Sequence, residues 1–160
     1  MKTIAFLLSL FIVIFSSYTY SAAFPSKKFL PVESAEEIAK SAIHVCNQNN
    51  LPVSVSIVND QGRLLYFYRG EGTGSNTVKT SFRKAYTAAT LKTATSDLIM
   101  AVETKGLSQL GKMEDDILLL TGGVPIRDGS HVVGAIGVSG APSPQADENC
   151  AVAAIDGFMK

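Results

Sequence analysis

The sequence of 160 residues has no tryptophan, only two cysteines and two histidines, and no net charge. The balance of 14 basic against 14 acidic residues, with no basic stripe, argues against a nucleic-acid-binding protein. Two cysteines cannot form a disulfide-rich scaffold, and the CxxC and HExxH metal motifs are absent. The GxSxG and GK[ST] motifs of hydrolases and phosphate-binding loops are also absent. With 46% hydrophobic and 18% charged residues, the chain is long enough to fold as one globular domain with its own core.

The first 23 residues have the pattern of a secretory signal peptide. Lys2 supplies one positive charge, an uncharged apolar stretch follows to Phe15, and small residues stand at positions 21–23. We expect cleavage after Ala23, with Ala22 as the alternative, and a periplasmic or secreted mature protein. An uncleaved membrane anchor is the competing interpretation, but serines interrupt the apolar run before it reaches the roughly 20 residues of a membrane span. Cytosolic cofactors such as ATP and NAD are therefore poor candidates.

The first half of the mature chain predicts an arm, a helix and a hairpin. Residues 24–33 contain two prolines and should form an extended arm. A helix should begin near Ser34, with an apolar face that includes Cys46 and a polar face that carries His44 to solvent. Residues 53–60 alternate between apolar side chains and serine, as a half-buried strand does, and residues 64–69 form its hairpin partner.

The second half predicts two helical stretches, three short strands and a closing helix. The helical stretches begin near Ser75 or Asn76 and near Thr95. Strands are expected at 117–120, 124–126 and 131–139, and the last helix at 146–159 with Asp147 as its cap. Hairpins, rather than crossovers, join most strands, so we predict the α+β class, with helices packed on an antiparallel sheet.

Five spaced motifs resemble those of one known family. Gly122-Gly123-Val124-Pro125-Ile126 is followed by the glycine-rich run at 133–141, and Asp60-x-Gly62 forms the hairpin turn. The other matching pieces are Lys84-Ala85-Tyr86-Thr87-Ala88, Thr95-Ser96 and Asp147-Glu148-x-Cys150-Ala151. Across residues 34–160 they resemble the GlcG/HbpS family, or haem-degrading domain family, which includes the C-terminal domain of PduO-type proteins. The resemblance implies a profilin-like α+β domain, haem binding in some members, and a homo-oligomer.

A haem site needs cations for the two propionates, an apolar slot and an axial donor. Arg69 and Lys84 could converge on a carboxylate, or both could be solvated surface cations. Bare backbone at Gly122 and Gly123, together with Ser139, could border the ligand. The competing interpretation of the glycines, including Gly134, Gly137 and Gly140, is that they allow tight turns and close packing of a helix on the sheet.

No single side chain stands out as the axial donor. His131 begins a strand after a turn and should lie at the rim, His44 lies on the polar helix face, and Tyr86 is a phenol within a family motif. Glu33 and Glu36 are weak candidates for a metal, because acids at a helix start are explained by the helix dipole. Cys46 and Cys150 form a disulfide in an oxidising compartment or are two buried thiols; the sequence leaves both open.

Three functions follow from these observations. We expect foremost an exported haem- or tetrapyrrole-binding protein without turnover, acting in haem or iron handling, with no nucleic-acid partner and no membrane attachment after signal cleavage. The first alternative is an enzyme that degrades haem or acts on a small organic acid held by Arg69 and Lys84. The second is an oligomeric structural or partner-binding module in which the glycine-rich face is a subunit interface.

Overall fold

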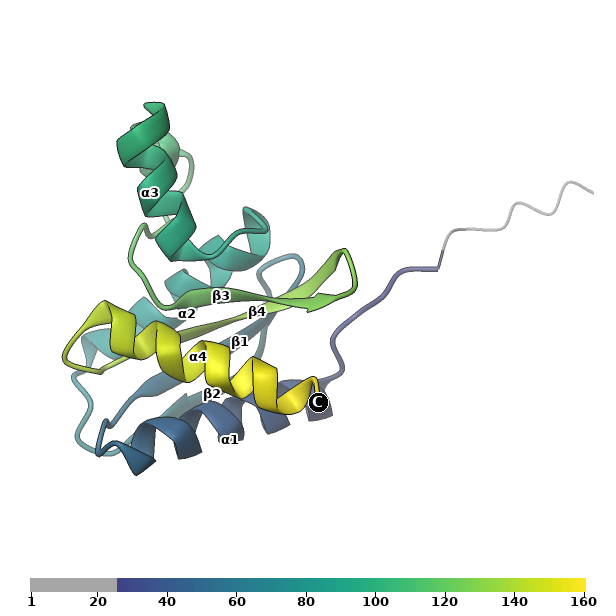
Figure 1. Cartoon of the computed structure of the whole chain (residues 1–160), viewed down its shortest axis with the longest axis vertical. Helices are drawn as coiled ribbons and strands as arrows, with labels where there is room; N and C mark the ends of the chain where they lie inside the picture. The colour runs from purple at the N-terminus through teal and green to yellow at the C-terminus, as the bar shows by residue number, and fades with distance from the viewer. Residues whose placement is uncertain (1–25) are drawn as a thin grey trace, which may run out of the picture.

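The computed structural model describes residues 26–160, in which four α-helices, one short 3-10 helix and four strands follow one another (Figure 1). The elements are α1 (Val32–Gln48), β1 (Ser54–Asn59), β2 (Leu64–Arg69), α2 (Asn76–Thr90), α3 (Thr95–Lys105), η1 (Leu110–Lys112), β3 (Gly123–Asp128), β4 (His131–Ser139) and α4 (Pro144–Phe158). No helix within this range is long and apolar enough to cross a membrane. The expected signal peptide, residues 1–23, lies outside the described residues.

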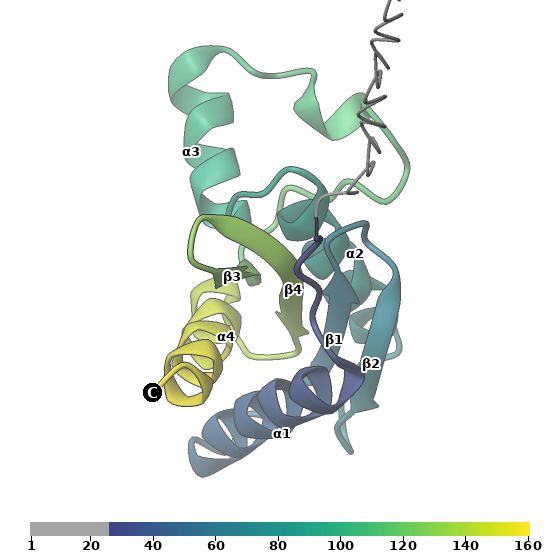
Figure 2. The same cartoon turned by 90° about the vertical axis from the view of Figure 1, so that its right-hand side faces the viewer.

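The four strands form one antiparallel sheet in the order β2-β1-β4-β3. α1 and α4 lie side by side on one face and α2 covers the other, while α3 projects away from the body (Figures 1 and 2). The predicted α+β class and antiparallel sheet are confirmed.

The two faces of the sheet are packed with side chains of different size. Beneath α1 and α4, branched residues such as Val55, Ile57 and Ile136 form the main hydrophobic core. Beneath α2 the side chains are small, with Ala135 of β4 against Ala85 and Ala88. Small residues let a helix backbone approach the sheet closely, so α2 lies directly against the backbone of β3 and β4.

β1 is a central strand with both faces covered, and the prediction that it is half-buried is wrong. Its serines are fully buried under α2. Ser54 pairs its hydroxyl with Thr77 at 2.8 Å, and Ser56 pairs with Ser81 at 2.9 Å. A buried hydroxyl with a partner avoids the cost of desolvation, so the alternation of serine and valine also suits a strand buried on both sides.

Residues 117–120 do not form the predicted strand; they run as an irregular segment beside α2. The Thr87 hydroxyl accepts the backbone N–H of Leu118 at 2.8 Å, and the Arg83 guanidinium donates to the Ile117 carbonyl at 3.0 Å. Side chains of a helix therefore satisfy backbone groups that a neighbouring strand would otherwise satisfy.

The arm before α1 crosses one end of the sheet. Leu30 is buried, and a Cβ on Gly134 would lie only 2.8 Å from its side chain, so the glycine of β4 makes the space that holds the arm. The turns that join β1 to β2 and β3 to β4 lie at this same end. α1 begins at Val32, slightly earlier than predicted.

Candidate functional site

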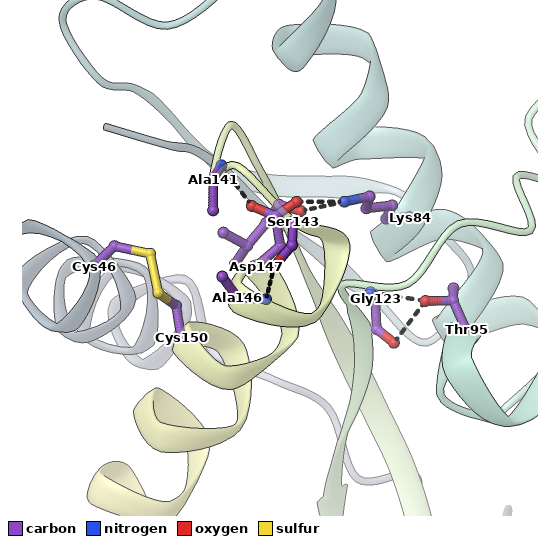
Figure 3. A network of polar contacts seen from close by, with 10 residues as sticks. Cys46, Lys84, Thr95, Gly123, Ala141, Ser143, Ala146, Asp147 and Cys150 are labelled. Atoms are coloured by element: carbon purple, nitrogen blue, oxygen red, sulfur yellow. Dashed lines mark hydrogen bonds and ion pairs between the residues drawn. A yellow bond between two sulfur atoms is a disulfide. The ribbon is translucent and has the colours of Figure 1, made fainter. Parts of the chain in front are cut away.

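Lys84 is buried inside the protein and is not available to a ligand, contrary to the sequence-based prediction. Only 1% of its side chain is exposed. Its ammonium donates to the Asp147 carboxylate at 2.8 Å and to the Val138 carbonyl at 2.9 Å (Figure 3). The other carboxylate oxygen of Asp147 accepts the backbone N–H of Ala141 at 2.9 Å. This pair joins α2, the end of β4 and α4.

Burial governs the protonation of both partners. It lowers the pKa of Lys84 and raises the pKa of Asp147, while the hydrogen bond and the attraction between them oppose both changes. The helix α4 is capped instead by the Ser143 hydroxyl, which accepts the backbone N–H of Ala146 at 3.2 Å. Asp147 was predicted as that cap and is in fact the counter-ion of Lys84.

The predicted cleft at Gly122 and Gly123 is closed by α2. A Cβ on Gly122 would lie 2.8 Å from the Lys84 ammonium, and a Cβ on Gly123 would overlap the Lys84 carbonyl oxygen. The Gly123 backbone N–H donates to the Thr95 hydroxyl at 3.0 Å (Figure 3). Ser139 is also buried, at the end of β4. These residues serve close packing of helix on sheet and leave no room there for a ligand.

Gly137 follows the same pattern, since a Cβ at that position would overlap the Ser81 carbonyl oxygen of α2. The glycine-rich face around Gly137 is therefore covered by the chain's own helix, and the interpretation of this face as a subunit interface is wrong. Arg69 is exposed at the end of β2 and donates to the Thr73 carbonyl at 3.0 Å, so it and Lys84 have separate partners and do not form a joint carboxylate anchor.

Of the three donor candidates, Tyr86 lies in surroundings that disfavour haem. It borders a cleft of about 430 Å³ together with Arg63, Glu114 and Asp116. Burial raises the pKa of the Tyr86 phenol, and the nearby Glu114 and Asp116 carboxylates raise it further. A phenol that holds its proton is a poor ligand for ferric iron, and carboxylates beside it would repel propionates.

The two histidines are both exposed, as predicted, but in different surroundings. His44 lies on the outer face of α1, where its Nε2 is 3.1 Å from the Gln48 amide nitrogen. His131 opens β4 and borders a groove of about 800 Å³ at the end of the sheet. The groove is also lined by four cationic side chains, Lys27, Lys28, Lys92 and Arg127, together with Ser26, Asp60, Ser130 and Val132.

Two of these cations, both on the arm, form surface ion pairs with carboxylates of neighbouring turns and strands. Lys27 pairs with Asp60 of the β1–β2 turn at 2.6 Å, and Lys28 pairs with Asp128 at the end of β3 at 2.8 Å. Sequence reasoning missed the four cations, because they come from the arm, the segment after α2 and β3. The only sequence signal was the hairpin at Asp128-Gly129, which places His131 at the rim.

A second, more apolar groove of about 400 Å³ adjoins the first. Both are bordered by Lys27 and Asp60. The second is lined mainly by Phe29, Leu30, Pro31, Val32 and Leu65. Phe29 is 73% exposed and offers apolar surface at this groove. The two grooves together present an apolar part and a cationic part, divided by the Lys27–Asp60 ion pair.

The remaining candidates are placed as follows. Glu33 is exposed, and Glu36 pairs with Lys40 at 2.8 Å. Within residues 26–160, no three His, Cys, Asp or Glu side chains gather in a way that could hold a metal ion. Cys46 and Cys150 are joined by a disulfide that ties α1 to α4 (Figure 3).

A known protein family and a curated relative both match most of this chain. The family model described as "Haem degrading protein HbpS-like" matches residues 30–156. An uncharacterised 15.0 kDa protein from the dhaT-dhaS intergenic region of Citrobacter freundii is 30% identical over 134 residues, which cover 82% of this chain and 93% of that protein.

Solved structures show the same arrangement. The crystal structure of HbpS has a TM-score of 0.78 and 31% identity, covering 83% of this chain and 92% of that one. The crystal structure of a PduOC:heme complex has a TM-score of 0.74 and 26% identity, covering 81% of this chain and 94% of that one.

Proposed function

The chain belongs to the HbpS-like family, and from that membership we propose that it is a haem- or tetrapyrrole-binding protein. A relative of the same fold forms a complex with haem, which supports the assignment of ligand class. The observation in this chain that carries the proposal is the pair of adjoining grooves lined by the arm, called the double groove below. The first groove has the His131 imidazole and four cationic side chains, and the second has an apolar wall.

The residues of the double groove fit the needs of a haem site. Imidazole is a common axial ligand of haem iron. Lysine and arginine recognise carboxylates such as the two propionates. Phe29, Pro31 and Leu65 offer apolar surface for the edge of the ring. When bound, haem would supply the iron and its absorption bands; the chain supplies the donor, the cations and the apolar wall.

His131 is the preferred axial donor among the three candidates, because its groove has four cationic side chains against one carboxylate, whereas the cleft beside Tyr86 has one cation, Arg63, against two carboxylates. Tyr86 faces carboxylates. His44 lies beside Gln48 on the outer face of α1 and borders neither of the two grooves.

We further propose that the protein binds haem without turnover, in haem or iron handling. Haem degradation is the competing function, because the family carries that description. Incubation of the haem complex with a reductant in air distinguishes them. A Soret band that persists supports binding alone, and a band that decays with release of a bile pigment supports degradation.

Export and self-association are parts of the same proposal. The leader pattern at residues 1–23 and the disulfide between Cys46 and Cys150 both suit an oxidising compartment outside the cytosol. Mass spectrometry of the secreted protein should find Phe24 as the first residue, and retention of Met1 would contradict cleavage. Light scattering of the purified protein should give a mass larger than that of one chain.

Haem titration followed by absorbance tests the binding proposal. The protein should shift the Soret band with a saturable end point at micromolar concentrations. His131→Ala should weaken binding and move the band, whereas the matched variant His44→Ala should leave both unchanged. A flat titration of the wild-type protein would reject haem as the ligand.

A further inference from the structure

We propose that the cationic end of the groove is a recognition site for a pair of carboxylates, with Lys92 and Arg127 as its anchors. The inference rests on the proposed function, because it concerns the same groove. It adds that carboxylates are the groups of the ligand that this groove recognises. Two sources supply that chemistry: the two propionates of haem, and a free dicarboxylic acid.

The charge of the groove is only partly neutralised by the protein itself. Lys27 and Lys28 are engaged by Asp60 and Asp128. Within residues 26–160, Lys92 and Arg127 have no ion-pair partner among the Asp and Glu carboxylates. Asp60 is the one carboxylate among the groove-lining residues, against four Lys and Arg side chains. Two cations thus remain for an anion that enters the groove.

Lys92 occupies an unusual backbone position. Its φ of 56° lies in the left-handed region, just after the end of α2. Glycine is preferred at such a position, because a side chain is strained there. Helices commonly end on a residue in this conformation, so Lys92 marks the point where the chain leaves α2 at the edge of the groove.

Arg127 contacts the backbone of Lys92. Its guanidinium donates to the Lys92 carbonyl at 2.7 Å, and this bond holds the segment after α2 against β3. A guanidinium has five N–H donors, so one bond to a carbonyl leaves others for a ligand. The bond holds the Arg127 guanidinium against the Lys92 backbone, and both residues border the same groove as His131.

The adjoining apolar groove decides which carboxylates fit best. Phe29 and Leu65 lie beyond the Lys27–Asp60 pair, so a ligand with a flat apolar body and acidic groups at one edge meets both parts. That pair lies near the surface, with 60% of the Lys27 side chain exposed, and it is weak enough to open when a ligand enters. A small dicarboxylate would occupy the cationic part alone.

The test compares three probes on the mature protein, residues 24–160: haem, haem dimethyl ester, and succinate. Haem and its ester are followed by absorbance, and succinate by shifts of backbone amide signals. The variants are Lys92→Gly and Arg127→Gln, and Lys79→Gln on the exposed side of α2 is the matched control. We expect each groove variant to bind haem about threefold to tenfold more weakly, and the control to bind as wild type. The ester should bind more weakly than haem and equally to all four proteins.

Lys92→Gly separates recognition from folding. Glycine relieves the strain after α2, so this variant should melt at or above the wild-type temperature while its haem affinity falls. Equal haem affinity in all four proteins, or an ester that responds to the variants as haem does, would overturn the inference.

Failure of the proposed function is recognised separately. If haem does not bind but succinate shifts the amide signals of Lys92, Arg127 and Val132, the carboxylate site stands and the free dicarboxylate is its source. If neither haem nor succinate binds, the inference is overturned as well.

Discussion

At the scale of single residues, the most consequential contact is the ion pair between Lys84 and Asp147. Both side chains are removed from water, and each has a second partner on the backbone. Desolvation of two charges offsets most of their attraction, so such a pair adds little net stability compared with well-packed apolar residues. Losing one partner is a different matter, because the other charge then stays buried alone.

We therefore predict a strong asymmetry between single and double replacements. Lys84→Met should destabilise the protein by about 3–5 kcal/mol, because the Asp147 carboxylate is left without its counter-ion. Lys84→Met combined with Asp147→Leu should lose less than Lys84→Met alone. Urea denaturation of the wild type, Lys84→Met and the double variant measures this, and a double variant that is less stable than Lys84→Met would contradict it.

The Tyr86 phenol offers a test of local electrostatics. Because burial and the Glu114 and Asp116 carboxylates raise its pKa, it should ionise above its usual value of 10.0 in an absorbance titration near 295 nm. Its stabilising contribution should be complete below that value and should disappear as the pH rises through the folded-state pKa. Glu114→Gln should lower the pKa, and Tyr86→Phe should remove the transition. Ionisation at or below the usual value would contradict the account.

Sequence patterns found Lys84 but not its role. The motif Lys84-Ala85-Tyr86 stood out through the family resemblance, and a lysine on a helix is ordinarily solvated. Nothing local shows that Asp147, far along the chain, is its counter-ion, because only the packing of α2 and α4 on opposite faces brings the end of β4 between them.

At the scale of elements, the fold depends on how closely α2 approaches the sheet. Gly137→Ala should destabilise the protein by about 2–3 kcal/mol, because the new methyl group would overlap backbone atoms of α2 at Ser81 and Ala85. Gly157→Ala is the matched control: it lies near the exposed end of α4 with ordinary space around it, and it should be neutral or stabilising by up to about 1 kcal/mol. Thermal melts compare the two, and equal effects would contradict the packing argument.

The disulfide is the other long-range constraint, since it closes a segment with a sequence separation of 104 residues between α1 and α4. In the chain-entropy model such a loop contributes up to about 4–5 kcal/mol. Cys46→Ala with Cys150→Ala should therefore lower the free energy of unfolding by about 2–5 kcal/mol, and a reductant should have no further effect on this variant. Unchanged stability in the absence of the disulfide would contradict the constraint.

Most elements could be predicted from the sequence because their signals are local. β2 and β4 begin and end where the alternation and the turns predict, at Leu64–Arg69 and His131–Ser139. The prediction failed where side-chain contacts replace the hydrogen bonds between strands. Residues 117–120 are apolar and short like a strand, yet Thr87 and Arg83 of α2 form hydrogen bonds with backbone groups of this segment. β1 was judged half-buried because serine is usually exposed, whereas α2 supplies hydroxyl partners.

At the scale of the whole molecule, the candidate site exists only because separate segments meet at one end of the sheet. The arm provides Lys27 and Lys28, the segment after α2 provides Lys92, β3 provides Arg127 and β4 provides His131. No spacing along the chain shows this cluster, which is why sequence reasoning placed the ligand instead at the glycine-rich strands. The double groove thus forms only when the chain folds. Its cations, imidazole and apolar wall together suit the proposed ligand, haem or another tetrapyrrole.

The central claim, that haem binds in the double groove with His131 as its axial donor, is tested most directly by chemical rescue. The absorbance spectrum of the ferric haem complex is recorded for His131→Gly with and without added imidazole, with His44→Gly as the control and unbound haem removed by gel filtration. The account predicts that His131→Gly loses the wild-type spectrum and that imidazole restores it, while His44→Gly keeps the wild-type spectrum throughout. A His131→Gly complex with the wild-type spectrum and no response to imidazole would contradict the claim.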